Sequence, residues 1–119
     1  MDGEISAEEL QELLSADDPV RIVDIRSPGQ FRRGHIPNSE NIPFAKLTGQ
    51  IEAFDGDERV VTVCPHGQAS VQAARLIGSF EGFDGRVESL ETGLEGWPHE
   101  LTTGDQSESE NPDAPDAPF

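Results

Sequence analysis

The chain has 119 residues, a length that fits one domain with its own buried core. Its 24 acidic and 8 basic residues give a net charge of −16, which excludes nucleic acid as a partner because phosphate binding needs a basic surface. The single cysteine excludes an internal disulfide and a cysteine-based zinc site. No stretch resembles a signal peptide or a span of about 18 apolar residues, so we expect a cytoplasmic protein that does not enter a membrane.

The excess of acid has two explanations that the sequence leaves open. A solvated acidic surface accounts for most of it, and an acidic tail adds to the count. Adaptation to a salty, halophilic cytoplasm also fits, because 1 M salt shortens the Debye length to about 3 Å and so screens self-repulsion. Repulsion between copies that each carry −16 favours a monomer.

The first half of the chain alternates between helical and strand patterns. A capping box from Ser6 to Glu9 predicts a helix that continues through the leucines at 10, 13 and 14. An apolar run over 20–25 predicts a strand, and Ser27-Pro28 predicts the start of a short helix that stops at Gly34. A short strand is expected over 39–42, and apolar spacing of three and four residues predicts an amphipathic helix over 44–54.

The second half continues this alternation. A β-branched strand over 60–63 leads into a loop over 64–70 and then a helix to about residue 80. A further strand is expected over 87–90, and a closing helical turn over 94–97. Strands that alternate with helices predict an α/β fold with a mainly parallel sheet. From residue 102 onward the chain has almost no apolar content, which predicts a disordered tail.

The only cysteine stands where a functional site is expected. In parallel α/β sheets the site lies beyond the carboxyl ends of the strands, and Cys64 directly follows such a strand. Its sulfur is then close to several backbone N–H groups and to the positive end of a helix dipole, which favours the reactive thiolate. Gly67 supplies the positive φ or the close approach that the loop needs. We therefore interpret Cys64 as a nucleophile rather than a buried apolar residue.

Three neighbouring side chains each have two interpretations. His66 either donates to an anionic substrate or faces solvent. Ser70 either bonds the sulfur or caps the following helix, and the two roles are compatible. Arg26 either pairs with a carboxylate such as Asp24 or helps to bind a substrate anion.

Four motifs occur in a characteristic order, and they are Val23-Asp24-Ile25-Arg26, Gly34-His35-Ile36-Pro37, Cys64-x-His66-Gly67-x-x-Ser70 and Gly93-Leu94-x-x-Trp97. Together they resemble the rhodanese family of sulfurtransferases, from about residue 5 to residue 97. The resemblance implies a rhodanese-like three-layer α/β sandwich, with a mainly parallel five-stranded sheet and helices on both faces. It implies a rhodanese-like domain over residues 1–101, followed by the acidic tail over 102–119.

The resemblance also implies a mechanism. The Cys64 thiolate would take the outer sulfur of thiosulfate or another sulfane donor, and the persulfide would pass that sulfur to a thiol or to cyanide. Such a cycle needs no metal and no organic cofactor. Its partners would be small sulfur donors, thiol acceptors and a sulfur-carrier protein. The residues expected to bind the substrate are His66, Gly67, Gln68, Ala69, Ser70 and Arg26.

The sequence departs from the family pattern at Pro65, which follows the nucleophile and has no N–H to offer. Phosphatases and arsenate reductases that share the fold close a C-x5-R loop with arginine, whereas Ser70 stands at that position here. A phosphoryl dianion would lack its bidentate clamp, which makes that activity a weak alternative. A protein-to-protein persulfide carrier, or a regulatory binding module with little activity on free thiosulfate, remains the main alternative.

Overall fold

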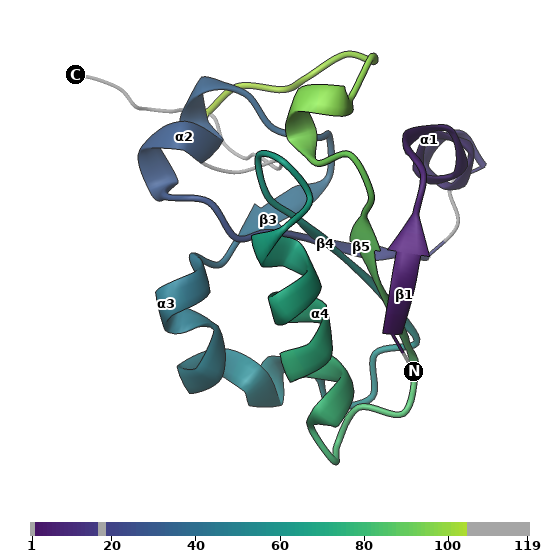
Figure 1. Ribbon diagram of the computed structural model, residues 1–119, viewed down its shortest axis with the longest axis vertical. Helices are drawn as coiled ribbons and strands as arrows, with labels where there is room; N and C mark the ends of the chain where they lie inside the picture. The colour runs from purple at the N-terminus through teal and green to yellow at the C-terminus, as the bar shows by residue number, and fades with distance from the viewer. Residues whose placement is uncertain (1, 17–18, 105–119) are drawn as a thin grey trace.

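Five parallel strands form the centre of the computed structural model, which describes residues 2–16 and 19–104 (Figure 1). The strands lie in the order β1-β5-β4-β2-β3, and every strand pairing is parallel. Their bounds are β1 (Asp2–Ile5), β2 (Arg21–Asp24), β3 (Ser39–Asn41), β4 (Arg59–Val63) and β5 (Arg86–Leu90). The expected α/β architecture with a five-stranded parallel sheet is confirmed.

The helices begin where the sequence places their caps. Capping boxes at Ser6 and Ser27 start α1 (Ala7–Ser15) and α2 (Pro28–Arg33), as expected. The predicted single helix over 44–54 is instead α3 (Phe44–Leu47) followed by the 3₁₀ helix η1 (Thr48–Phe54). Gln50 has non-helical backbone angles and follows Gly49, a poor helix former, which explains the break. The remaining helices are α4 (Ala69–Ser79) and the 3₁₀ turn η2 (Leu94–Gly96).

Helices cover both faces of the sheet and give the expected three layers. One core cluster joins α3, η1 and α4 to the sheet through residues such as Leu47, Phe54 and Ile77. A second cluster joins α1 and the segment around Trp97 to the opposite face, with Leu10 at its centre. Figure 1 shows α3 and α4 close together and α1 well apart from both. None of the helices in the described part of the chain is long and apolar enough to cross a membrane.

Two features at the ends of the domain differ from the sequence analysis. The residue pattern did not predict β1, which pairs with β5 at one edge of the sheet and buries Ile5. At the other end, Thr102 exchanges two backbone hydrogen bonds with His35, and the Gly104 N–H donates to the carbonyl of Arg32. The chain therefore still contacts the domain beyond the expected boundary at residue 101. The rest of the predicted tail, 105–119, lies outside the described residues.

Candidate active site

β4 places Cys64 at the carboxyl edge of the sheet, under the start of α4. Successive strand residues point to opposite faces. Val60 and Cys64 accordingly belong to the core cluster beneath α4, whereas Val61 and Val63 belong to the cluster on the other face. Only 2% of Cys64 is exposed, so a reactant must reach its sulfur through the loop that follows.

Three polar groups contact the Cys64 sulfur. The Gly67 N–H donates to Sγ at 3.1 Å and the Ser70 N–H at 3.3 Å. The thiol itself donates to Ser70 Oγ at 3.3 Å. When the thiol loses its proton, the Ser70 hydroxyl can rotate and donate to the sulfur instead. All three groups then stabilise the thiolate, because hydrogen bonds to an ionised acceptor are the strong ones.

Burial and hydrogen bonding oppose each other at this sulfur. Burial raises the pKa of the Cys64 thiol, since it penalises the charged form. The Ser70 hydroxyl lowers that pKa, and so do the backbone N–H groups of Ser70, His66 and Gly67, and together they outweigh burial. The pKa of Cys64 is therefore below its ordinary value, and a larger fraction of the sulfur is nucleophilic at neutral pH.

Ser89 belongs to this network, although the sequence analysis did not single it out. Its Oγ lies 2.6 Å from Ser70 Oγ, and both residues have 0% exposure. The parallel register sets Ser89 opposite Thr62, whose Oγ1 donates to the Ser70 carbonyl at 2.7 Å. The sequence offers one indication of this role. Ser89 is a hydroxyl residue two positions after Val87 on the same strand, so it lies on the same buried face.

Two glycines let the loop lie against the chain that follows β5. Gly67 has φ of +83° and Gly93 has φ of +70°, a region that side chains other than glycine rarely adopt. A Cβ on Gly67 would also overlap the Glu91 carbonyl oxygen, and one on Gly93 would overlap the backbone of 65–67. The loop geometry thus requires glycine at both positions.

The segment after β5 holds the loop through its backbone. The Leu94 N–H donates to the Cys64 carbonyl at 2.8 Å, and the Glu95 N–H donates to the Pro65 carbonyl at 3.0 Å. Pro65 cannot donate to the sulfur, but its carbonyl helps to fix the loop. Trp97, which is 7% exposed, anchors the same segment in the core beneath α1. These contacts connect the Gly93–Trp97 motif to the Cys64 loop.

The other loop side chains that we expected to bind substrate lie at the surface. His66, Gln68 and Ala69 are exposed. The His66 ring faces Glu95, with 3.3 Å between Nδ1 and Oε1, while its backbone N–H acts on the sulfur. Substrate contact by the His66, Gln68 or Ala69 side chain remains a prediction.

Arg26 is occupied by a buried ion pair. Its guanidinium contacts both carboxylate oxygens of Asp24, the closest at 2.7 Å, and also donates to the Gly34 carbonyl at 2.7 Å. The Asp24 and Arg26 side chains are 1% and 9% exposed. The pair ties the end of β2 to the end of α2, so its evident role is structural. Direct contact of Arg26 with a substrate stays a prediction.

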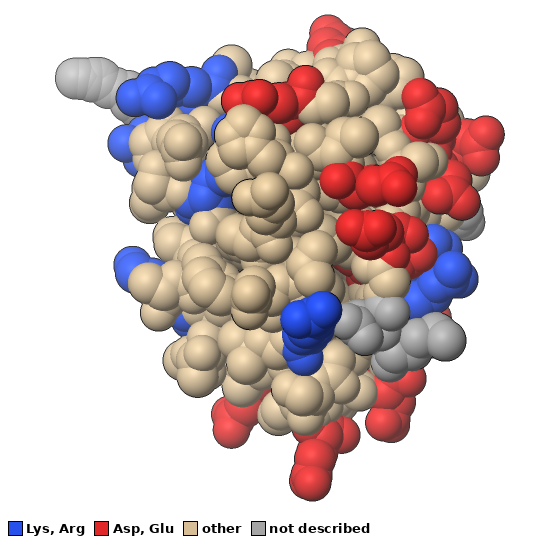
Figure 2. Space-filling view, viewed as in Figure 1, with Lys and Arg blue, Asp and Glu red and all other residues tan. Residues whose placement is uncertain are grey.

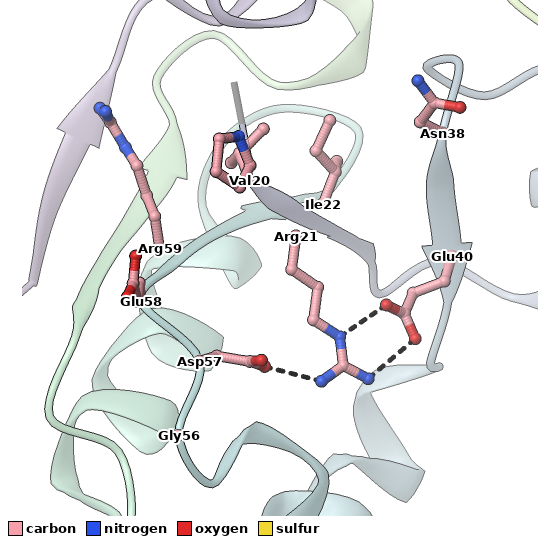
Figure 3. Close-up of a pocket in the computed structure, with 10 residues that line it drawn as sticks. Val20, Arg21, Ile22, Asn38, Glu40, Gly56, Asp57, Glu58 and Arg59 are labelled. Carbon is pink, nitrogen blue, oxygen red and sulfur yellow. Dashed lines mark hydrogen bonds and ion pairs between the residues drawn. The ribbon is translucent and has the colours of Figure 1, made fainter. Parts of the chain in front are cut away.

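A pocket of about 710 Å³ lies at the amino ends of the strands, where β2, β3 and β4 begin (Figure 3). Arg21 crosses it and pairs with Glu40 at 2.6 Å and with Asp57 at 2.7 Å. These hydrogen bonds raise the pKa of Arg21 against the opposing effect of burial. Because the two carboxylates already occupy the guanidinium, it is not available to an anionic ligand, and the pocket lies far from the Cys64 sulfur.

Comparison with known proteins agrees with the fold. The family profile of the rhodanese-like domain matches residues 6–100. A thiosulfate sulfurtransferase, GlpE, of Pseudoalteromonas translucida is 36% identical over 93 residues, which cover 78% of this chain and 86% of that protein. A sulfurtransferase of Allochromatium vinosum is 32% identical over 97 residues, covering 82% of this chain and 89% of the relative.

Solved structures show the same likeness. A rhodanese-like domain protein from Staphylococcus aureus superposes with a TM-score of 0.76 and 28% sequence identity, covering 87% of this chain and 99% of that one. The matched residues include every strand from β2 to β5 and the Cys64 loop. The chain belongs to the rhodanese-like domain family.

Proposed function

We propose that this protein is a sulfurtransferase that carries sulfane sulfur as a persulfide on Cys64. The observation that carries the proposal is the set of donors around Sγ, the N–H groups of Gly67 and Ser70 and the Ser70 hydroxyl. They favour a thiolate at the carboxyl edge of a parallel sheet, where such folds place their chemistry. The relatives named as sulfurtransferases support the same reaction class.

The first half of the cycle breaks one S–S bond and forms another. With thiosulfate as donor, the Cys64 thiolate attacks the outer sulfur, the sulfur–sulfur bond of the donor breaks, and sulfite leaves with the electron pair. The product is a negatively charged Cys64 persulfide. Backbone N–H groups of the loop, together with the positive start of α4, then face an anion at every stage of the reaction.

The second half returns the enzyme to its starting state. An acceptor, either cyanide or a thiolate, attacks the terminal sulfur of the persulfide. The persulfide bond breaks, the electron pair returns to Cys64 as thiolate, and the acceptor leaves as thiocyanate or as its own persulfide. Each half-reaction is balanced without an external oxidant or cofactor, which predicts ping-pong kinetics.

A phosphatase reaction fits the same site less well. The fold offers a C-x5-R loop to that chemistry, and here Ser70 takes the place of the arginine. Ser70 is buried with Ser89 rather than open to a phosphoryl group, and it carries no charge to balance a dianion.

Thiocyanate formation from thiosulfate and cyanide tests this proposal. We expect parallel lines in double-reciprocal plots for the wild type and no turnover for Cys64→Ser. Ser70→Ala serves as a control that should retain reduced activity, since it leaves the nucleophile and two donors in place. Intersecting lines, or turnover that survives Cys64→Ser, would contradict a Cys64 persulfide.

A further inference from the structure

Acidic residues are unevenly distributed along this acidic chain. Residues 60–80 contain no aspartate or glutamate, and residues 25–51 contain only Glu40. These stretches nevertheless hold five of the eight basic residues, namely Arg26, Arg32, Arg33, Lys46 and Arg75. With five basic residues and one acidic residue, the two stretches carry a net charge of +4, and the rest of the chain carries −20.

The acid-free stretches form one side of the molecule. They comprise α2, α3, the Cys64 loop and α4, which follow the carboxyl ends of β2, β3 and β4. In Figure 2 the left side is mostly uncharged surface with Lys and Arg, whereas Asp and Glu lie at the top, on the right and at the bottom. The basic groups of α2 and α3 thus lie at the carboxyl ends of the strands, as Cys64 does.

Arg33 and Lys46 differ from the paired arginines of this protein. Arg21, Arg59 and Arg86 each contact a carboxylate at the amino ends of the strands. Arg33 and Lys46 are exposed and have no carboxylate partner in the part of the chain that the structure describes.

An exposed aromatic side chain accompanies these two cations. Phe44, at the start of α3, is 44% exposed, and its N–H donates to the Ile25 carbonyl at the end of β2. We call Arg33, Phe44 and Lys46 the basic rim. An exposed ring that shares the carboxyl end of the sheet with two exposed cations is typical of a surface that meets another protein.

We propose that the basic rim is the docking surface for a protein that exchanges sulfur with Cys64 and whose own reactive cysteine is surrounded by acidic residues. The inference rests on the proposed sulfurtransferase function. Because Cys64 is 2% exposed, a protein partner must press its cysteine against the loop. The residues around the partner's cysteine then reach the rim, which follows the carboxyl ends of β2 and β3 as the loop follows that of β4.

Charge complementarity selects an acidic partner. The exposed Glu91 and Glu95 flank the Cys64 loop on the side of β5 and repel such a partner there. The partner therefore approaches from the side of the rim, and this orients the encounter. A small anion can already accept hydrogen bonds from the converging N–H groups of the loop. It would gain nothing from Phe44, and it would contact only one of two cations that stand on different helices.

The test compares two synthetic acceptor peptides, each with one cysteine, flanked by glutamates in one and by lysines in the other. Cys64 is first loaded with sulfur, and loading is verified by intact mass. Each transfer rate is divided by the rate of that peptide with a small uncharged disulfide, which corrects for the different reactivity of the two thiols. Despite the net charge of −16, we expect the glutamate peptide to react about tenfold faster at low salt, and the difference to vanish near 1 M salt.

Two double variants distinguish an effect of the rim from an effect of net charge. Arg33→Gln with Lys46→Gln should abolish most of the preference and leave transfer to cyanide unchanged. Gln11→Glu with Ser15→Glu makes the same change in net charge on α1, over the other face of the sheet, and should keep the preference. Equal rates for the two peptides, a preference for lysine, or an equal loss in both double variants would overturn the docking proposal.

The acidic tail of this chain is an alternative occupant that the experiment must distinguish from a partner. The chain beyond Gly104 is acidic, and the Gly104 N–H donates to the Arg32 carbonyl, so the test includes the tail as an alternative occupant of the rim. Neutralising its acids in the full chain should change the preference by less than about twofold, and a rise above about tenfold would assign the rim to the tail instead. The substitutions are Asp105→Asn, Glu108→Gln, Glu110→Gln, Asp113→Asn and Asp116→Asn.

If Cys64 loads and cyanide unloads it while the peptides do not differ, only the docking proposal fails; if no donor loads Cys64, both proposals fail.

Discussion

The hydroxyl oxygens of Ser70 and Ser89 lie 2.6 Å apart with no exposure to solvent, and Ser70 Oγ lies 3.3 Å from the Cys64 sulfur. This contact extends the site from the loop into β5. When Ser89 donates to Ser70 Oγ, the Ser70 hydrogen is directed to the sulfur, where it stabilises a thiolate. We therefore expect Ser89 to be a positioning residue that acts through Ser70.

Ser89→Ala tests that relay. Losing one buried hydrogen bond should lower the alkylation rate of Cys64 at neutral pH by about two- to tenfold and raise the pKa of the thiol. Thr62→Val is the matched control, because Thr62 bonds the Ser70 carbonyl and not its hydroxyl. It should reduce stability without moving the pKa of Cys64, measured by the pH dependence of alkylation. Equal pKa shifts in both variants would mean that Ser89 acts only through packing.

Ser70→Ala should have the larger effect on pH dependence. The variant removes a direct hydrogen bond to the sulfur and leaves the Gly67 and Ser70 N–H groups in place. Because the folded-state pKa of Cys64 is lowered in the wild type, its activity is retained as pH falls until that pKa is reached. In Ser70→Ala the pKa rises and the loss of activity begins at higher pH. Profiles of kcat/KM that coincide for the two proteins would contradict this role.

The same pKa carries a consequence for stability. A thiol whose pKa is lower in the folded state stabilises the fold above its unfolded-state pKa, and this contribution is lost as pH falls through the folded-state value. Denaturant unfolding of the wild type and of Cys64→Ser should therefore diverge as pH rises from neutral into the alkaline range. A difference that does not depend on pH would indicate that the thiol is not ionised there.

Gly67→Ala should disable the loop. Positive φ and overlap with the Glu91 carbonyl both oppose a side chain at this position, at a cost of about 2 kcal/mol in stability. We expect loss of most sulfur transfer, since relaxing the strain moves an N–H away from the Cys64 sulfur. Gly49→Ala is the control, because a Cβ there meets nothing within 4 Å. Near-normal activity in Gly67→Ala would show that this donor is dispensable.

Arg26→Gln separates the two interpretations of that arginine. Removing one partner of the buried pair leaves the Asp24 carboxylate uncompensated and should lower the free energy of unfolding by about 3 kcal/mol. With a structural role, the fraction that remains folded should have an unchanged KM for thiosulfate. A large rise in KM with little loss of stability would instead assign Arg26 to substrate binding.

The alternation of strand and helix patterns was sufficient to predict an α/β fold with a mainly parallel sheet, whereas the three layers and the five strands were expected from the family resemblance. One capping box predicted α1, Ser27-Pro28 predicted α2, apolar runs predicted β2 and β4, and the strand-to-helix loop singled out Cys64. The role of Cys64 as nucleophile stays a prediction. What the sequence could not show depends on contacts between distant segments. β1 forms because it pairs with β5 at the edge of the sheet, and its short sequence carries little apolar signal of its own.

Two features of the site were hidden for the same reason. Ser89 reaches Ser70 only through the parallel register of β4 with β5. The requirement for glycine at position 93 arises from the approach of the loop to the chain after β5, which no local pattern reveals. The uneven distribution of charge was present in the sequence, but its meaning depends on the edge of the sheet that α2 and α3 share with Cys64.

Intact mass after incubation with thiosulfate tests the central claim most directly. The wild type should gain about 32 Da, the mass of one sulfur added to a reactive thiolate, and cyanide should remove it with release of thiocyanate. Cys64→Ser, the matched control, should gain nothing under the same conditions. An adduct that persists in Cys64→Ser, or a folded wild type that takes up no sulfur from thiosulfate or from any persulfide donor, would contradict sulfur transfer through Cys64.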